Sequence, residues 1–332
     1  MPQRFKIARR YRATCRYVAD ALQDRCNNLF FASPLRKFFS FFALSKRDAT
    51  MIGTVRTPLS LEETGLEPYR TLRRPIDHRR EGLFVAEGEK VVRRLLGSSI
   101  RLLSMLMTDP LLDRYRSLVE KRKEPIDLFI AEKKLLEGIV GFECHQGIMA
   151  VGMVPPPTTL EATIAASPLP RILVATDHLT SAENTGVVAR NCAAFGACAL
   201  LAGETSADPW LRRSVRNSMG TIFKLPVLYA ENLADSLRTL RKSFGFRVFA
   251  AHPRRGSVPL FEADFSGDSC IVLGSEGEGI SPAVLDACDE AIAIPMAEGI
   301  DSLNVACASA AILYEAVRRR SVPARNGCTG PA

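Results

Sequence analysis

Residues 271–281 read IVLGSEGEGIS, a short apolar run that passes into three glycines and then a serine. Continuous apolar runs of this length are typical of strands buried on both faces of a parallel sheet. Glycines 274, 277 and 279 let the backbone approach a ligand beyond the strand end, where open α/β sheets bind ligands. Glu276 and Glu278 disfavour a bare phosphate and suit a ligand with hydroxyls, amines or a positive centre. Taken alone, a glycine-rich turn with solvated carboxylates explains the stretch equally well.

The pattern around this stretch alternates between strands and helices from residue 171 to 320. Strands are predicted at 172–176, 197–202, 226–229, 247–251, 270–273 and 291–295, with helices between them. A helix over 232–244 ends at a glycine, and another begins at the Ser-Pro pair 281–282. The expected fold class is therefore α/β, with a parallel sheet in the C-terminal part.

A second patterned block precedes this one. Strands are predicted at 83–86, 100–107, 126–131 and 147–154, with helices over 87–96, 109–123 and 132–139. Asp109 is the expected N-cap of the second helix. Residues 66–154 thus predict a small α/β domain. Residues 155–170, which contain three consecutive prolines, predict a linker, and 321–332 a tail.

The net charge of +8 comes from the first 50 residues, which hold eleven Lys and Arg against three Asp. The remaining 33 basic and 33 acidic residues balance, so basic composition is no argument that the main body binds nucleic acid. This basic extension has the composition of a transit peptide, but sequence preceding a true start at Met51 is the preferred interpretation. Neither interpretation makes residues 1–50 part of the fold.

Other composition signals exclude several protein classes. No apolar run of about 18 residues predicts a membrane span. The nine cysteines form no C-x-x-C pair, and the four histidines share no ligand spacing, so no metal is expected. The cysteines predict buried thiols in a reducing compartment, and the expected location is the cytoplasm.

Another loop of interest follows the strand that ends at Thr176. Asn184 can cap the helix that begins there, Gly186 permits close approach, and Arg190 lies about two turns inside. An arginine near the carboxyl edge of a sheet can bind phosphate or carboxylate in a bidentate manner. A solvated surface arginine is the simpler alternative at this point.

The last loop, which precedes the alanine-rich C-terminal helix, carries polar residues of the same kind. Asp301 or Ser302 is the expected N-cap, and Ser302 and Asn304 are expected in the first turn, facing the ligand region. Each of these residues taken alone is explained equally well as a helix cap. Arg318 to Arg320 complement the helix dipole at the other end.

Three motifs occur in order: N-x-G-x-x-x-R-x-x-x-A-F-G over 184–196, L-G-x-E-G-x-G-I-S over 273–281, and I-P-M-x-x-G-x-x-S-L-N-V over 294–305. Together they resemble the motif set of the SpoU/TrmH family of RNA ribose 2′-O-methyltransferases, in the SPOUT class. The match covers about 171–320. Residues 83–154 resemble the family's substrate-binding domain, which is similar to a ribosomal-protein fold.

The resemblance implies a trefoil-knotted C-terminal domain that binds S-adenosylmethionine and works as a homodimer on RNA, with rRNA preferred to tRNA. Arg190 would act on the ribose hydroxyl, as base or by orienting it, with its guanidinium supplied across the dimer. The other residues implied in catalysis are Ser302, Asn304, Glu276 and Asn184. Those implied in donor binding are Leu273, Gly274, Ile294, Met296, Leu303 and Ala251.

RNA contacts are expected from arginine clusters, although paired arginines on helices are usually just solvated. The clusters are Arg70, Arg73, Arg74, Arg79, Arg80, Arg93, Arg94, Arg212, Arg213 and Arg216. Two other functions stay open: a non-catalytic RNA-binding member of the same fold, and a nucleotide-binding oxidoreductase. Intact Arg190, Ser302 and Asn304 disfavour the former, and the missing dinucleotide fingerprint disfavours the latter.

Overall fold

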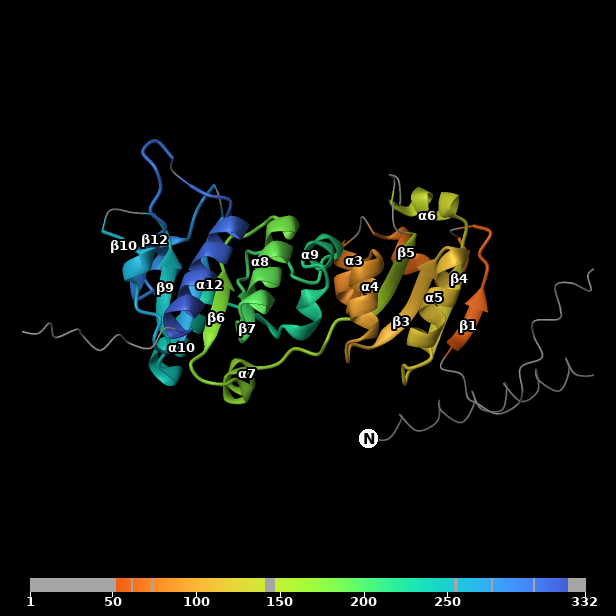
Figure 1. Ribbon diagram of the computed structural model, residues 1–332, viewed down its shortest axis with the longest axis horizontal. Coiled ribbons are helices and arrows are strands. Elements are labelled where there is room, and N and C mark those ends of the chain that lie inside the picture. Colours follow the sequence, from red (N-terminus) through yellow and green to blue (C-terminus); the bar gives the residue numbers. More distant parts are fainter. Residues whose placement is uncertain are drawn as a thin grey trace, which may run out of the picture. The chain divides into compact units, whose positions relative to one another are not determined.

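The computed structural model describes residues 52–60, 62–72, 75–140, 147–253, 256–275, 277–300 and 302–321. Within these segments the chain forms two sheets with helices packed against them (Figure 1), which confirms the α/β class. The basic extension over 1–50 and the tail from 322 onward lie outside the described residues.

The larger sheet has seven strands and carries the predicted ligand edge. Its strands are β6 (Ile172–Thr176), β7 (Ala199–Ala202), β8 (Val227–Tyr229), β9 (Arg247–Ala251), β10 (Val258–Pro259), β11 (Ser269–Leu273) and β12 (Glu290–Ala293). Their order is β10-β12-β9-β11-β6-β7-β8, and every neighbouring pair is parallel. All seven carboxyl ends therefore lie at one edge. Six of these strands were predicted, and β10 has only two residues, too few to show a period.

Helices cover both faces of this sheet (Figure 1). On one face lie α8 (Ala182–Ala194) and α12 (Val305–Ser321), and on the other α7 (Leu160–Ala166), α10 (Leu233–Phe244) and α11 (Pro282–Leu285). Successive strand residues point to opposite faces. Val174 accordingly packs with the α8 and α12 residues, whereas Leu173 packs with those of α10. Coverage of both faces explains why the strands are continuously apolar.

The smaller sheet is mixed. It consists of β1 (Ile52–Arg56), β2 (Leu83–Glu87), β3 (Leu102–Met107), β4 (Ile126–Ile130) and β5 (Ile148–Met153), in the order β1-β4-β3-β5-β2. Strand β5 is antiparallel to both neighbours, and the other pairs are parallel. The accompanying helices are α2 (Glu67–Arg70), α3 (Pro75–Glu81), α4 (Glu89–Leu96), α5 (Asp109–Val119) and α6 (Lys133–Val140). Sequence patterning missed β1 because its residues are largely exposed and show no buried alternation.

One hydrophobic cluster contains residues from both patterned blocks. Trp210, in the loop after β7, packs against Phe84 of β2 with ring centroids 5.0 Å apart and stacks on Phe223 at 6.3 Å. Helix α9 (Arg212–Asn217) and the 3-10 helix η3 (Thr221–Lys224) follow this loop, and η4 (Leu260–Glu262) lies later in the chain. Residues 210–227 thus complete the core of α4 and α5, and the predicted domain limits stay a prediction.

Helix starts differ from the sequence predictions at three places. Helix α8 is capped by Ser181, whose hydroxyl accepts a hydrogen bond from the Asn184 N–H at 3.2 Å, so Asn184 is not the cap. Helix α12 begins at Val305, later than expected, and the Asn304 side chain accepts from Ala306 N–H at 3.0 Å. Helix α5 begins at Asp109, with Thr108 before it. Each segment offers capping residues in succession, and composition alone does not choose between them.

None of the described cysteines, which are Cys192, Cys198, Cys270, Cys288 and Cys307, forms a disulfide. Cys192 and Cys270 are buried, and burial raises the pKa of both thiols. Cys307 on α12 is exposed, contrary to the expectation of buried thiols, because it lies on the open side of that helix. Among the described residues, no helix is both long and apolar enough to cross a membrane, and no group of His, Cys, Asp or Glu could hold a metal ion.

Candidate active site

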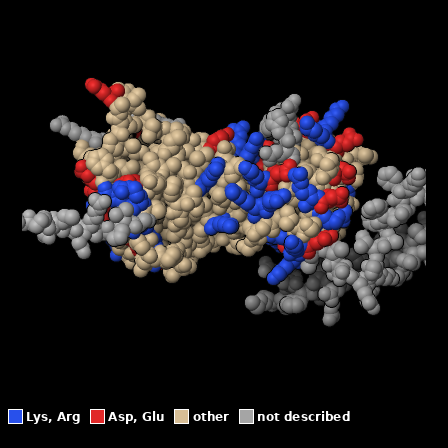
Figure 2. All heavy atoms as spheres, viewed as in Figure 1, with Lys and Arg blue, Asp and Glu red and all other residues tan. Residues whose placement is uncertain are grey.

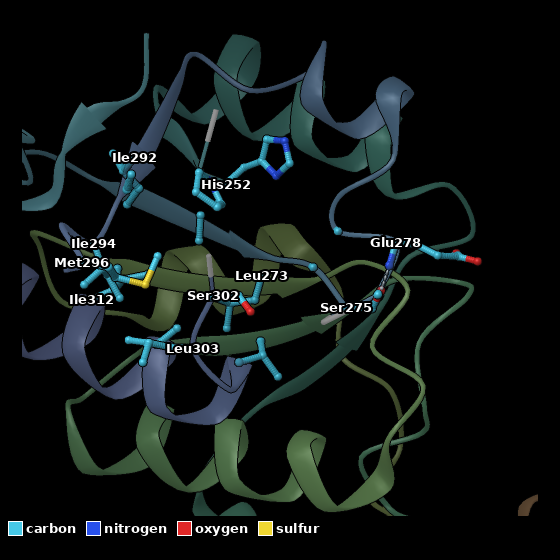
Figure 3. A pocket seen from close by; sticks show the side chains of 18 residues that line it. His252, Leu273, Ser275, Glu278, Ile292, Ile294, Met296, Ser302, Leu303 and Ile312 are labelled. Atoms are coloured by element: carbon cyan, nitrogen blue, oxygen red, sulfur yellow. Dashed lines mark hydrogen bonds between the residues drawn. The ribbon is translucent and has the colours of Figure 1, made fainter. Parts of the chain in front are cut away.

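A cavity of about 280 Å³ lies at the carboxyl edge of the large sheet, beyond β9, β11 and β12 (Figure 3). The strand register places the residues at the base of the cavity side by side, because Ala251 of β9 lies beside Leu273 of β11 and Ile292 of β12. The lining residues are Ala251, His252, Pro253, Leu273, Gly274, Ser275, Gly277, Glu278, Gly279, Ile292, Ala293, Ile294, Met296, Ser302, Leu303, Val305, Ala308 and Ile312. All six residues expected to bind the donor are among them.

The second motif forms a tight closed loop at this cavity. Ser275 and Gly279 exchange two backbone hydrogen bonds of 3.1 Å, and Gly279 has a φ of +71°. A Cβ atom built on Gly274 would lie 2.4 Å from the carbonyl carbon of Gly279, so only glycine fits there. The loop turns its backbone toward the cavity. Glu276 lies outside the described residues.

The third motif supplies the opposite wall. Ile294, Met296 and Leu303 give it an aliphatic surface, and Ser302 adds a hydroxyl in the same cavity (Figure 3). Ser302 and Asn304 are exposed and precede α12. The prediction that both lie in the first turn of this helix is therefore wrong. The chain between β12 and α12 remains irregular, which leaves this wall open to solvent.

The first motif lies next to the cavity but does not line it. Asn304 Nδ2 donates a hydrogen bond to Asn184 Oδ1 at 3.2 Å, which joins the start of α8 to the third loop. Asn191 Nδ2, further along α8, donates to Ala306 O and to Ser309 Oγ, both at 2.8 Å. Arg190 is exposed on α8 and is not among the cavity-lining residues of the single chain. Among the described residues, its guanidinium has no hydrogen-bond or ion-pair partner.

Sequence reasoning missed Asp177, which links two of the motifs. Asp177 directly follows β6, its side chain is buried, and its Oδ2 accepts a hydrogen bond from Ser281 N–H at 2.7 Å. The carboxylate thereby fixes the end of the second loop against the start of the first. A carboxylate placed immediately after a buried strand was the available signal.

His252 and Ser275 were also missed as lining residues. His252 directly follows β9, and its ring lies close to Gly279, about 3.6 Å from where a Cβ on that glycine would be. Figure 3 shows this ring pointing toward the loop that carries Glu278. The signal was its position one residue beyond Ala251, at a strand end already expected to contribute.

The predicted RNA-binding arginines fall into two classes. Arg212 and Arg216 on α9 both pair with Glu87, a buried carboxylate at the end of β2. Arg94 donates to Met219 O at 2.8 Å, and Arg213 pairs with Glu183 at 3.1 Å. These four side chains therefore have structural partners.

Three other arginines of the predicted RNA-binding set are more exposed to solvent. Arg79 is 70% exposed, with its Nε 3.6 Å from an Asp208 oxygen, and Arg80 and Arg93 are exposed. Figure 2 shows basic residues gathered over the region of α3, α4, α5 and α9, while the surface over α8 is mostly uncharged. Arg73 and Arg74 lie outside the described residues.

Comparison with known proteins identifies this arrangement. Residues 171–314 match the model of the SpoU rRNA Methylase family. The chain is 32% identical over 265 residues to an uncharacterised tRNA/rRNA methyltransferase of Mycobacterium tuberculosis, covering 77% of this chain and 90% of that protein. It is also 32% identical over 193 residues to the 23S rRNA (guanosine-2′-O-)-methyltransferase RlmB of Ralstonia nicotianae, covering 58% and 77%.

Solved structures agree with these relatives. The AdoMet-bound rRNA methyltransferase of Sinorhizobium meliloti superposes with a TM-score of 0.69 at 25% identity, covering 81% of this chain and 99% of that one. The family resemblance read from the three motifs is thus confirmed. This chain belongs to the SpoU rRNA methylase family of RNA methyltransferases.

Proposed function

We propose that the protein transfers a methyl group from S-adenosylmethionine to a ribose 2′-hydroxyl of RNA, with rRNA as the preferred substrate. The observation that carries this proposal is the cavity at residues 251–253, 273–279 and 292–312, which unites the second and third family motifs. The similarity to a guanosine-2′-O-methyltransferase acting on 23S rRNA supports the ribose oxygen and the rRNA preference.

The cavity suits the chemistry of S-adenosylmethionine. Its aliphatic wall of Leu273, Ile294 and Met296 offers an apolar slot for a flat purine ring, flanked by the backbone of the closed glycine loop. The Glu278 carboxylate at the rim suits a ligand with positive charge. The donor, when bound, supplies a methyl carbon activated by a sulfonium, whose departure as a neutral sulfide needs no acid.

The chain must do three things for the attacking hydroxyl: position it in line with the methyl carbon, accept its proton and exclude water. Transfer would form an oxygen–carbon bond, break the donor's sulfur–carbon bond with its electron pair remaining on sulfur, and pass the hydroxyl proton to a base at the site and from there to solvent water. We assign the positioning to Arg190, Asn184, Ser302 and Asn304, of which Asn184 and Asn304 are hydrogen-bonded to each other. A guanidinium keeps its proton in proteins, so phosphate and hydroxyl binding is the physically simpler role for Arg190.

We further propose a homodimer in which a second copy of the chain supplies Arg190. In the single chain this guanidinium does not line the cavity. Helix α12 carries exposed apolar residues on its open side, including Tyr314, which is 58% exposed and packs edge-to-face on Phe195 of α8. Leu303 before this helix is 43% exposed. Small residues such as Ala308, Ala310 and Ala311 allow a close isologous contact. The knotted topology expected of the class belongs to this proposal too.

The test is the Arg190→Ala variant, assayed for transfer of the radiolabelled methyl group to ribose in total RNA from a strain that lacks the gene. We expect transfer to fall by at least about a hundredfold, because positioning contributes on that scale. Donor affinity, measured by calorimetry, should stay within about threefold. Arg116→Ala, an exposed arginine on α5, is the matched control and should retain activity.

Three results would contradict the proposal. If Arg190→Ala retains full transfer, the catalytic assignment is wrong. If the wild-type protein binds the donor but methylates no RNA, the non-catalytic alternative holds. Methyl groups found on bases instead of ribose would overturn the 2′-hydroxyl as acceptor.

A further inference from the structure

A second cavity lies away from the donor cavity, where the loop after β7 meets α3. It has a volume of about 210 Å³. Its lining residues are Leu72, His78, Arg79, Gly82, Leu83, Val154, Asp208, Trp210, Leu211, Arg212 and Tyr229. It is smaller than the donor cavity, and its size suits a single ring system.

The side chains of this cavity combine aromatic surface, positive charge and one carboxylate. Tyr229, at the carboxyl end of β8, is 42% exposed and donates its hydroxyl to Asp208 Oδ1 at 2.9 Å. Asp208 also accepts from Trp210 N–H at 2.9 Å, and its side chain is only 13% exposed. The phenol ring of Tyr229 is thus held by its hydroxyl while much of its surface stays open.

The charged and titratable side chains of this cavity differ in how firmly they are paired. Arg212 is committed to Glu87, and burial lowers the pKa of His78, which leaves that imidazole neutral near pH 7. Burial and the Asp208 carboxylate raise the pKa of Tyr229, so the phenol remains protonated. Arg79 is the positive charge that a ligand can reach most easily. Its side chain is 70% exposed, and its contact with Asp208 is long at 3.6 Å. A phosphate beside the cavity would be a better partner.

The second cavity lies along the same edge of the large sheet as the donor cavity. Both lie beyond carboxyl ends of the same parallel sheet, one at β9, β11 and β12 and the other at β7 and β8. Three to four strand spacings of about 4.8 Å separate them, roughly 15–20 Å. A single strand of RNA laid along this edge would therefore pass both.

We propose that this second cavity holds one unstacked nucleobase of the RNA substrate, at a position a few nucleotides from the methylated ribose. The base would stack on the open face of Tyr229, and Arg79 would bind its phosphate. Unpaired bases are recognised in this way, by stacking on aromatic or guanidinium planes with hydrogen bonds to their edges. The inference rests on the proposed function only in taking RNA as the substrate.

The test compares variants of the full chain in binding a fluorescent single-stranded RNA decamer of mixed sequence, by anisotropy at fixed salt. Tyr229→Ala and Arg79→Ala should each weaken binding by about fivefold or more, as expected for a lost stacking or phosphate contact. Tyr229→Phe keeps the ring and should stay within about twofold. Arg80→Ala removes the same charge from the same helix, outside the cavity, and should weaken binding less than Arg79→Ala.

Ultraviolet cross-linking of the same RNA supplies an independent readout, with Tyr229 or Trp210 as the expected cross-linked residue. Equal effects of Arg79→Ala and Arg80→Ala, unchanged affinity of Tyr229→Ala, or cross-links confined to other segments would overturn the inference. Thermal unfolding of each variant separates loss of binding from loss of folding. Donor binding measured on the wild-type protein tests the proposed function separately, because a protein that binds the decamer through this cavity but not S-adenosylmethionine would refute only the methyl transfer.

Discussion

At the scale of single residues, the site depends on positions where the backbone has no space for a side chain. Gly274 faces the carbonyl of Gly279 across the closed loop, and Gly186 of α8 faces Ser214 of α9, with a Cβ only 2.3 Å from the Ser214 oxygen. Gly277, between the two bridge partners, has open space around it. The three glycines of the second motif therefore have different physical roles.

Gly274→Ala should distort the loop and weaken donor binding by about tenfold or more, with a loss of about 1–3 kcal/mol in the free energy of unfolding from overpacking. Gly267→Ala, outside the cavity, is the control, because its added methyl group meets no atom within 4 Å. Calorimetry with S-adenosylmethionine and urea denaturation measure the two effects. Equal donor affinity of both variants would show that the loop does not depend on close packing at Gly274.

At the scale of elements, α12 combines the cavity wall with the ion pairs of its last turns. Arg318 and Arg319 hydrogen-bond to Glu315 at 2.7 to 2.8 Å and lower the pKa of that carboxyl to about 2 from an ordinary 4.5. Arg320 turns the other way and donates to backbone oxygens of Pro170, Arg171, Phe265 and Gly267. The end of the helix is thereby fixed to the opposite end of the sheet from the cavity.

The Glu315 ion pairs predict a defined pH dependence. A carboxyl whose folded pKa is depressed stabilises the protein above its unfolded pKa, and this contribution is lost as the pH falls from about 4.5 toward 2. We expect it to be about 1–2 kcal/mol after screening by solvent. Glu315→Gln should be less stable than wild type at pH 7 and equal to it near pH 2. A constant difference between the two proteins over this range would contradict the assignment.

Sequence patterns identified the elements of the large sheet well, because continuous apolar runs and glycines follow directly from burial on both faces. They failed where the deciding contact is remote in sequence. Asp177 binds Ser281, more than a hundred residues later, and Arg212 pairs with Glu87 in the other patterned block. Strand β1, with its exposed side chains, depends on pairing with β4 and leaves no periodic signal. For the same reason, the sequence analysis named the arginines of α9 only as candidate RNA contacts and did not predict their ion pairs with Glu87.

At the scale of the whole molecule, one hydrophobic cluster of the described residues contains side chains from both sheets. Trp210 contacts Phe84 of the small sheet and Phe223 of the segment before β8. Val215 and Ile222 belong to the same cluster. The small sheet therefore completes its core with residues from the C-terminal block.

Trp210→Ala should lower the free energy of unfolding by about 3–5 kcal/mol, as expected for a buried aromatic residue. The loss should affect both sheets, so amides of β2 and β8 should gain hydrogen exchange together. Phe261→Ala, whose side chain is 53% exposed, is the control and should change stability little. Mass spectrometry of exchanged peptides measures both variants. Faster exchange confined to one sheet would show that the sheets unfold independently.

The missing side chain at Gly186 has a consequence for how two helices of the fold move relative to each other. Helix α8, which carries Arg190, touches α9 at this glycine without any intervening side chain, and α9 is anchored to β2 by the Glu87 carboxylate. We therefore expect α8 and α9 to move together, because no side chain separates their backbones at this glycine.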